Sequence, residues 1–359
     1  MDFPSRPLSQ LLGSSGPVHA VSYSASPGTY ILTGSADRSI RLYNPSTTTA
    51  PPPLPEGRLI QTYAAHGYEV LALAVAGDNA RFASAGGDRA VFLWDVATAQ
   101  TTRRFGGASG HGGRVNAVAF GGAGDSLVVS GGLDTTVRVW DTRSGGGSFG
   151  GKPVQILTDA KDAVAAVAVS GAEIVAGSVD GCVRSYDVRM GRLVVDVLPA
   201  SVASLCLARD AKTVLVGALD SKLRLLDRAT GACLRTYAHP ARRNDELRVQ
   251  AVLGGKERFV VAGDEMTATT ADTTAPTAEA AGRIWAWDLL TGKVVAQLAV
   301  PWGGGGDGNE GRRRVVVGRD GKEKERRNVV TCLAWKEGGF GSQFCAGGTS
   351  GVVTVFGEG

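Results

Sequence analysis

Three residues of the sequence are of the types that form a hydrolytic triad: His66, Ser84 and Asp88. In a serine hydrolase the hydroxyl attacks a carbonyl carbon, the imidazole removes the hydroxyl proton, and the carboxylate orients the imidazole. The serine does not lie in a Gly-x-Ser-x-Gly elbow, the turn that exposes the nucleophile in many such enzymes. A tryptophan, Trp94, also follows the aspartate at a short distance, and the triad chemistry gives it no role.

The same four residue types recur one unit further along the chain, as His111, Ser130, Asp134 and Trp140. An enzyme does not need two copies of one triad a single repeat apart. A structural interpretation accounts for both copies: the indole N–H, the serine hydroxyl, the imidazole and the carboxylate form a hydrogen-bonded strut between buried strands. We therefore predict two structural struts and no catalytic residue.

Residues that could serve metal or phosphate chemistry are scattered. The sequence has five cysteines without a Cys-x-x-Cys pair and only four histidines. This distribution does not favour a zinc or iron site. The glycine run at 303–306 precedes no helical pattern and lacks the Lys-Ser/Thr of a phosphate-binding loop. We predict no metal ion and no cofactor.

A short pattern recurs along the whole chain and sets the positions of the struts. A small or hydroxyl residue is followed by an acid and then by an aromatic or large apolar residue, as in Thr33, Asp37 and Tyr43. Further copies begin at Ser84, Ser130, Ala176, Val216 and, in weaker form, Ala346, and Trp287–Asp288 ends another unit. Three insertions interrupt the pattern, at 46–56, 266–281 and 301–327. Without them the period is about 40–46 residues, the length of a four-stranded propeller blade.

The units predict an all-β protein, a single seven-bladed β-propeller over 1–359. Short β-branched segments such as 115–120 and 136–140 are typical of strands, and helical periodicity is absent. The last unit ends too close to the C-terminus to have an outer strand, so we expect residues of about 7–12 to close the ring. The predicted blades are about 18–63, 66–105, 111–157, 164–196, 202–237, 249–298 and 330–356.

The strut residues and their spacing resemble WD repeats. A narrower resemblance, carried by the stretches 66–71, 86–96, 176–191 and 219–227, is to the mitogen-activated protein kinase organizer family of small WD-repeat scaffolds. That family is linked to kinase cascades and to spliceosomal complexes. The resemblance implies kinase-pathway or splicing proteins as partners. The unpaired cysteines and the lack of a secretory signal predict a reducing compartment, so we expect a location in cytoplasm and nucleus. The three insertions depart from the compact family pattern.

Composition limits the other classes of partner. Thirty-eight Lys and Arg against 34 Asp and Glu give a net charge of +4, which is too small and too dispersed for a dedicated nucleic-acid binder. No secretory signal and no apolar run long enough to span a bilayer occur, so we expect no membrane association. The basic segment 312–327 allows two interpretations, a nuclear-import or electrostatic contact and a solvated insertion.

The predicted binding surface is one mouth of the central channel, where the inner strands begin and the turns before the acids lie. Two units supply an apolar sector and three others supply charged or polar groups, an arrangement suited to a short peptide or a helix of a partner. The alternative is that small residues there are merely tolerated at a surface. The positions are Glu69, Arg114, Asn116, Leu133, Ala165, Val179, Ala203, Leu219 and Arg248.

These observations predict a non-enzymatic scaffold that binds proteins. The family resemblance favours a scaffold of a mitogen-activated protein kinase cascade, and the alternative it allows is a component of spliceosomal complexes in pre-mRNA splicing. An enzyme built on a propeller stays a remote alternative, because a fold does not dictate a function.

Overall fold

The computed structural model describes residues 3–45, 54–143, 151–265, 282–300, 328–336, 338 and 341–358, and the backbone of 315–317 and 323–325. The predicted insertion at 266–281 and most of the insertions at 46–56 and 301–327 lie outside the described residues. Within 301–327, a two-stranded hairpin of β26 (Val315–Val317) and β27 (Glu323–Glu325) is described.

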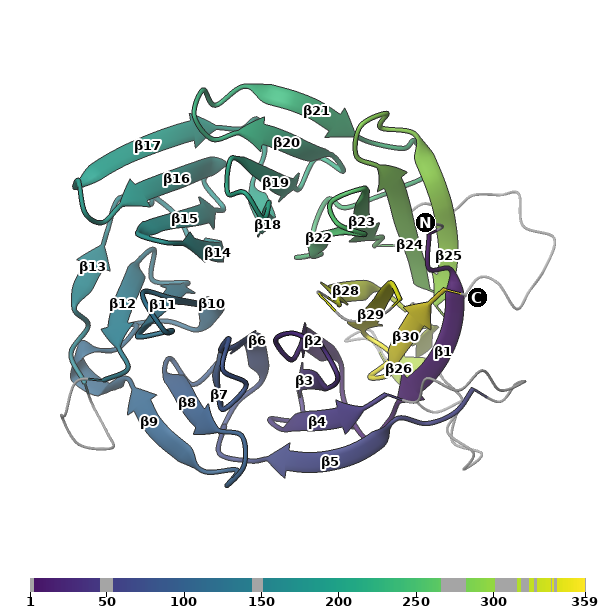
Figure 1. Cartoon of the computed structure of the whole chain (residues 1–359), viewed down its shortest axis with the longest axis horizontal. Coiled ribbons are helices and arrows are strands. Elements are labelled where there is room, and N and C mark those ends of the chain that lie inside the picture. The colour runs from purple at the N-terminus through teal and green to yellow at the C-terminus, as the bar shows by residue number, and fades with distance from the viewer. Residues whose placement is uncertain are drawn as a thin grey trace.

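Seven four-stranded antiparallel sheets surround a central channel, and each sheet runs from an inner to an outer strand (Figure 1). The first blade contains β2 (Val18–Tyr23), β3 (Ile31–Ser35), β4 (Ile40–Asn44) and β5 (Arg58–Tyr63). The second contains β6 (Val70–Val75), β7 (Arg81–Gly86), β8 (Val91–Asp95) and β9 (Thr101–Phe105). The third contains β10 (Val115–Gly121), β11 (Leu127–Gly132), β12 (Val137–Asp141) and β13 (Gln155–Leu157).

The next three blades repeat this order. The fourth contains β14 (Val164–Ser170), β15 (Glu173–Ser178), β16 (Cys182–Asp187) and β17 (Arg192–Val197). The fifth contains β18 (Val202–Leu207), β19 (Thr213–Ala218), β20 (Leu223–Asp227) and β21 (Cys233–Tyr237). The sixth contains β22 (Ala251–Gly254), β23 (Phe259–Gly263), β24 (Gly282–Asp288) and β25 (Val294–Val300).

The seventh blade is assembled from both ends of the chain. β28 (Val330–Trp335), β29 (Gln343–Gly348) and β30 (Val353–Gly357) are completed by β1 (Arg6–Leu11), which pairs antiparallel with β30. This pairing leaves β1 as the outer strand and removes an exposed edge from β30. The predicted all-β, seven-bladed propeller closed by an N-terminal strand is confirmed.

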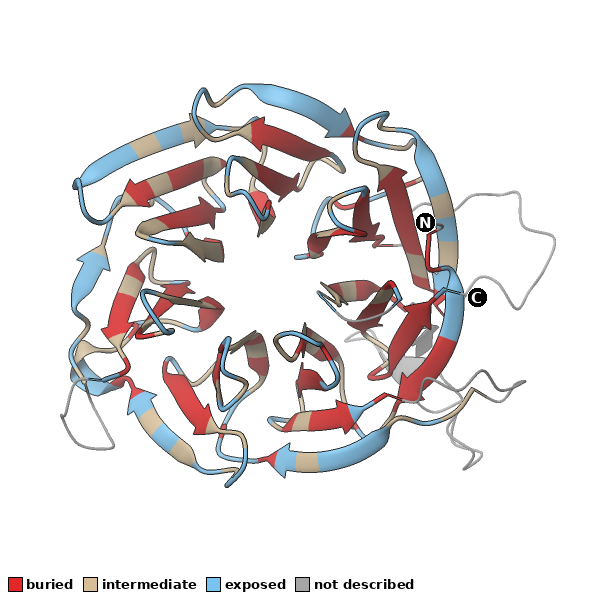
Figure 2. Ribbon diagram, viewed as in Figure 1, coloured by how far each residue is buried: buried red, intermediate tan, exposed pale blue. Residues whose placement is uncertain are grey.

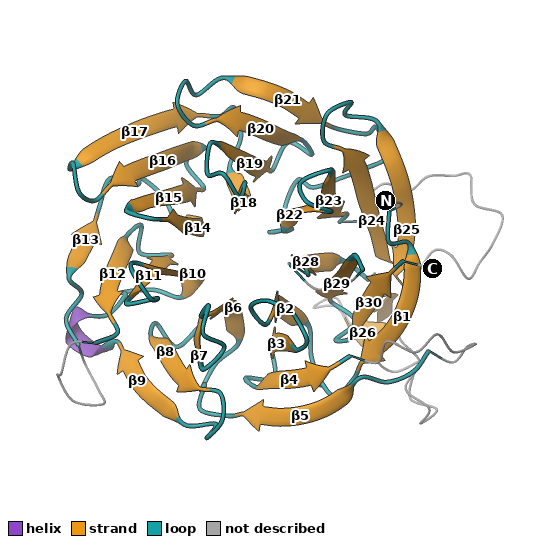
Figure 3. Ribbon diagram, in the orientation of Figure 1, coloured by secondary structure: helices purple, strands orange, loops and turns teal. Residues whose placement is uncertain are grey.

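Helical structure is almost absent. Among the described residues the helical element is the short 3-10 turn η1 (Gly107–Ser109), visible between the second and third blades in Figure 3. No helix in the described part of the chain has the length and apolar character needed to cross a membrane.

Apolar side chains pack between neighbouring blades, so the buried residues form a ring (Figure 2). The outer strands of the first six blades stay largely exposed, whereas most of β1 is buried. Trp94 of the second blade shows the pattern. Its ring stacks on Phe82 at a centroid distance of 5.7 Å and meets the edge of Tyr63 from the first blade, also at 5.7 Å. Aromatic pairs in these geometries add to the stability gained from burial. Each blade is therefore held in place by the next, which fixes the channel walls.

A recurrent irregularity aims side chains into or beside the channel. In six of the described blades the pairing of the inner strand with the second strand shifts immediately after the first residue of the inner strand, as at Val115 and Ala117. Such a bulge leaves one residue out of the ladder and redirects its side chain. The residues left out are His19, Leu71, Asn116, Ala165, Ala203 and Thr331.

Candidate functional site

The strut of the second blade forms a continuous chain of hydrogen bonds. The Trp94 indole N–H donates to Ser84 Oγ at 2.8 Å, and Ser84 Oγ lies 2.7 Å from His66 Nε2. His66 Nδ1 contacts Asp88 Oδ2, and Asp88 Oδ1 accepts the Gly67 N–H at 2.9 Å. Partial burial raises the pKa of Asp88, but the hydrogen bonds from His66 and Gly67 outweigh it and hold the pKa below its usual value.

The third blade repeats the strut with one additional cation. Trp140 Nε1 donates to Ser130 Oγ at 2.8 Å, His111 Nε2 lies 2.8 Å from the same oxygen, and His111 Nδ1 lies 2.8 Å from Asp134 Oδ1. All donors and acceptors match when the imidazole proton is on Nδ1 and the serine hydroxyl donates to Nε2. Arg138 adds an ion pair with Asp134, at 3.4 Å.

Burial excludes these serines from carbonyl chemistry. Ser84 and Ser130 have no exposed surface, and each hydroxyl already accepts an indole N–H. A nucleophile must reach the carbonyl carbon of a substrate. The geometry thus makes these groups parts of the scaffold that holds the turn acids at the mouth.

In three other blades an arginine pairs with the turn acid in place of histidine: Arg41, Arg184 and Arg224. In the fourth blade Arg184 donates from Nη1 to Ser178 Oγ at 2.6 Å and from Nη2 to Asp180 Oδ2 at 2.7 Å. The hydrogen bond to Asp180 raises the pKa of Arg184 above its usual value, so the guanidinium keeps its charge. Arg41 makes the equivalent ion pair with Asp37 in the first blade, at 2.9 Å. Sequence reasoning missed these struts, although an arginine four residues after the turn acid was the available signal.

The sixth blade departs furthest from the strut pattern. Trp285 Nε1 donates to Asp264 Oδ2 at 3.0 Å, and the His239 ring stacks on Trp285 at 4.3 Å, so this histidine lies in a loop and not in a strut. Glu265, which is 2% exposed, accepts the N–H groups of Asp245, Glu246 and Leu247. Its carboxylate therefore fixes the loop that leads to Arg248.

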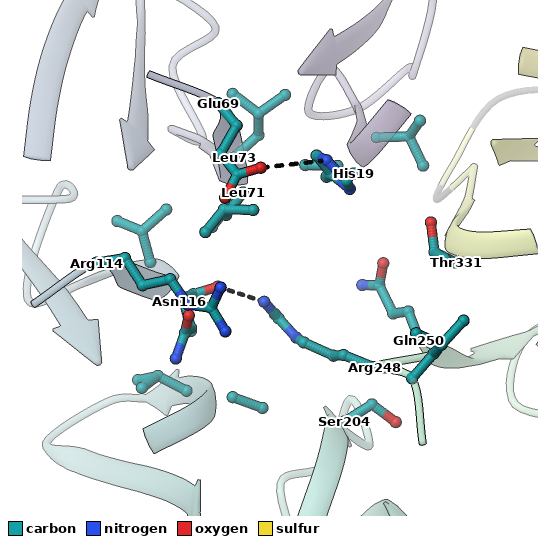
Figure 4. Close-up of a pocket in the computed structure, with 18 of the residues that line it drawn as sticks. His19, Glu69, Leu71, Leu73, Arg114, Asn116, Ser204, Arg248, Gln250 and Thr331 are labelled. Atoms are coloured by element: carbon teal, nitrogen blue, oxygen red, sulfur yellow. Dashed lines mark hydrogen bonds and ion pairs between the residues drawn. The ribbon is translucent and has the colours of Figure 1, made fainter. Parts of the chain in front are cut away.

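The channel contains a cavity of about 470 Å³. Four of the predicted partner-binding residues line it, together with residues from every inner strand except that of the sixth blade, whose preceding loop contributes instead (Figure 4). Arg248 Nη1 donates to the main-chain oxygen of Asn116 at 2.6 Å, and the Asn116 side chain donates to Val164 O at 3.0 Å. His19 Nε2 lies 3.8 Å from Glu69 Oε2. The four predicted residues are Glu69, Arg114, Asn116 and Arg248.

Other predicted positions form the rim above the cavity. Leu133 is 48% exposed and Val179 is 37% exposed, whereas Leu219 is half-buried. Each lies in a turn whose main-chain N–H is bonded to the segment before an inner strand, as from Leu133 to Arg114 O at 2.8 Å. In the second blade the main chain approaches closely at the end of β7: a Cβ on Gly86 would lie 1.9 Å from Glu69 O, so only glycine is accommodated at that position.

Two predicted contact residues lie elsewhere. Ala165 and Ala203 are 7% and 3% exposed, and neither lines the cavity. A methyl group at a bulge does not extend beyond the surrounding main chain, so the apolar sector is narrower than the sequence pattern indicated. The lining also contains Ser204 in β18 and Leu247 in the loop before β22, and the prediction named neither. No repeat position marks the loop that carries Leu247.

No group of three or more His, Cys, Asp or Glu side chains is arranged to hold a metal ion in the described part of the chain. The five cysteines are free thiols. Burial raises the pKa of Cys332 to about 12, so this thiol stays protonated and unreactive at neutral pH.

Comparison with known proteins gives the same architecture. The family model described as WD domain, G-beta repeat matches residues 5–44, 57–95 and 102–141. Human WD repeat domain-containing protein 83 is 38% identical over 304 residues, which cover 85% of this chain and 85% of that protein. The chain belongs to the family of WD repeat domain-containing protein 83. Two of the three matched segments of this WD-repeat protein contain the complete struts of His66 and His111.

Further relatives place this WD-repeat protein in a wider group. A WD repeat domain-containing protein 83 homolog from Dictyostelium discoideum is 28% identical over 319 residues, 80% of this chain and 87% of that protein. The guanine nucleotide-binding protein subunit beta of Zea mays is 36% identical over 115 residues, 31% of this chain and 29% of that protein. The similarity therefore extends over the propeller in the first case and over part of it in the second.

Proposed function

We propose that this WD-repeat protein is a non-enzymatic scaffold whose partners bind at the channel mouth. The observation that carries the proposal is the rim, where Leu133 and Val179 are exposed above a cavity lined by Glu69, Arg114 and Arg248. Exposed apolar side chains bordered by charged groups are typical of protein-binding surfaces. The struts hold the turns that carry the rim residues, so the surface is preorganised and binding costs less conformational entropy.

The proposed context is a mitogen-activated protein kinase cascade, in cytoplasm and nucleus. The support is the resemblance to the kinase organizer family together with similarity to human WD repeat domain-containing protein 83 along most of both chains. A scaffold of this kind needs several surfaces, and the seven blades offer separate rim turns and outer strands for them.

A second candidate is a component of spliceosomal complexes in pre-mRNA splicing. The feature that favours it is the basic segment 312–327, whose composition suits nuclear import or contact with an acidic partner. Direct binding of nucleic acid is not part of this proposal, because the net charge of the whole chain is only +4.

Affinity purification of the tagged full chain from native extract, followed by quantitative mass spectrometry, tests the proposal. Enrichment of kinase-pathway proteins supports the first context, and enrichment of splicing factors supports the second. A tagged chain that enriches no protein above the tag-only control refutes the scaffold function in both contexts.

A further inference from the structure

Two arginines in the channel have no acidic partner among the residues that the structure describes. Arg114 immediately precedes β10. Arg248 reaches from the loop before β22 across the channel to the main-chain oxygen of Asn116, two residues after Arg114 (Figure 4). Neither guanidinium forms an ion pair with any residue that the structure describes. Most other arginines near the mouth do: Arg41, Arg138, Arg184 and Arg224 each pair with the acid of their own turn.

The acid that lines the cavity is already engaged. Glu69 Oε2 lies 3.8 Å from His19 Nε2, on the wall formed by the first and second blades. With Arg114 and Arg248 facing it, the cavity has more positive than negative charge at neutral pH. The enclosing walls strengthen the field of these charges relative to bulk water.

The environment of Arg248 shows the same excess of positive charge. Although the residue as a whole is exposed to the channel, desolvation of its guanidinium and the charge of Arg114 lower its pKa to about 10. Two like charges held together without an anion repel each other, and an anion placed between them relieves the repulsion.

Size and access define the ligand further. A cavity of about 470 Å³ has the size of a site for a small ligand or for one or two side chains. A helix with its side chains is about 10–12 Å across, so a cavity of this volume suits a single side chain of an extended segment better than a whole helix. The Leu133 N–H is bonded to the main-chain oxygen of Arg114, which lines the cavity, so a segment whose side chain reaches Arg114 also passes the Leu133 turn.

We propose that the channel binds a carboxylate or phosphate group of an extended acidic peptide, clamped between Arg114 and Arg248. The inference rests on the proposed function, since it identifies the chemistry of the partner at the same mouth. Guanidinium groups bind both carboxylates and phosphates through paired N–H donors, so they recognise the shape of the oxyanion as well as its charge. The apolar rim then contacts the residues that flank the anionic side chain.

The test uses the full chain and two fluorescein-labelled probes, hexaglutamate and a glycine-rich hexapeptide with two phosphoserines. Binding is followed by fluorescence anisotropy at several NaCl concentrations. We expect at least one probe to bind, with affinity that falls as salt rises. Arg114→Gln and Arg248→Gln each lower the affinity about tenfold or more, as expected for the loss of a charge-assisted hydrogen bond. The probe that binds more tightly identifies carboxylate or phosphate as the natural group.

Two further variants make the test specific. Glu69→Gln removes the acid of the cavity and raises the affinity several-fold. Arg192→Gln removes one exposed positive charge on the outer strand β17 and leaves the affinity unchanged. Unchanged melting temperatures of the four variants establish that the fold is intact. The proposal is overturned when neither probe binds, or when Arg192→Gln weakens binding as much as the channel substitutions do.

The outcome separates this inference from the function on which it rests. If neither probe binds but substitutions at the rim still release protein partners, the mouth is a docking site without an anion clamp and the inference fails alone. If the probes bind through both arginines while no protein is retained at the mouth, the scaffold proposal fails and the anion site stands.

Discussion

Replacing Asp134 with alanine removes the acceptor at the end of a buried strut. The carboxylate accepts hydrogen bonds from His111 at 2.8 Å, from the Gly112 N–H at 2.8 Å and from the Thr136 hydroxyl at 2.9 Å. Gly112 is exposed and Thr136 is half-buried, so water replaces the aspartate for these two donors. His111 is 4% exposed and loses its partner in a site that water enters poorly. We expect Asp134→Ala to cost about 2–3 kcal/mol, mainly the penalty of one buried unpaired donor next to a lost charged acceptor.

The pH dependence of this cost provides an independent check. Partial burial raises the pKa of Asp134, but hydrogen bonds from His111, Gly112 and Thr136 more than offset this and hold the pKa far below 3.8. A depressed carboxyl pKa stabilises the fold above the unfolded-state value, and this stabilisation is lost as pH falls toward the folded-state value. The destabilisation by Asp134→Ala is therefore constant from pH 7 to about pH 5 and shrinks below about pH 4.

Urea denaturation followed by circular dichroism measures both effects. Asp134→Asn is the matched variant, since its amide oxygen still accepts from His111 and its cost should be smaller. Asp210→Ala, which removes an exposed acid elsewhere on the ring, should leave the midpoint unchanged. An Asp134→Ala protein as stable as the wild type would refute the strut and reopen the catalytic interpretation.

Three further predictions concern the ring and its loops. Leu11→Ala should lower the free energy of unfolding by about 2–5 kcal/mol in chemical denaturation, because Leu11 is 2% exposed in the closing strand. Deletion of 7–12 should lower the melting temperature further, and an unchanged melting temperature would contradict the closure. Burial raises the pKa of Tyr63 and of Tyr237 to about 12, and a raised tyrosine pKa stabilises the fold below pH 10 and ceases to do so as pH rises toward 12. Absorbance at 295 nm should therefore show ionisation of these tyrosines together with unfolding in that window, and ionisation at pH 10 without unfolding would argue against it. Glu265→Gln should increase proteolysis of the loop before β22 in limited digestion, since the carboxylate accepts several loop N–H groups, and equal cleavage rates would show that other contacts hold the loop.

The repeated parts of the molecule could be predicted from the sequence. Ser84 and Ser130 have the same neighbouring residue types at nearly the same spacing. Polar residues that recur in this way within predicted strands indicate a structural chain of hydrogen bonds. Ring closure followed in the same way, because a unit that ends at Phe356 lacks an outer strand and the segment before the first unit is strand-like. Periodicity predicts what every blade must share.

Features specific to one blade could not be predicted from the sequence. Arg41 and Arg184 form struts from other residue types than the histidine struts, so the recurring sequence pattern does not identify them. The hydrogen bond from Arg248 to Asn116 depends on the loop before β22. That loop is held by Glu265, which follows β23 and is therefore distant from it in the sequence. Burial of Ala165 depends on how far a methyl group projects at a bulge. These properties arise from tertiary contacts that no repeat encodes.

The central claim is that protein partners bind at the rim of the channel. Parallel affinity purification of three proteins tests it most directly: the wild type, the double variant Val179→Asp and Leu219→Asp, and the control Leu290→Asp. Leu290 is 77% exposed in the turn between β24 and β25, so its substitution adds a carboxylate at an exposed apolar position outside the rim.

A carboxylate at the rim removes an apolar contact and adds a desolvation cost, and loss of one buried anchor often weakens an interface by about 2 kcal/mol or more. The account predicts that the wild type and Leu290→Asp retain the same set of partners, and that the double variant loses them at an unchanged melting temperature. A double variant that retains every partner of the wild type would contradict the claim and would place the binding surface on another part of the propeller.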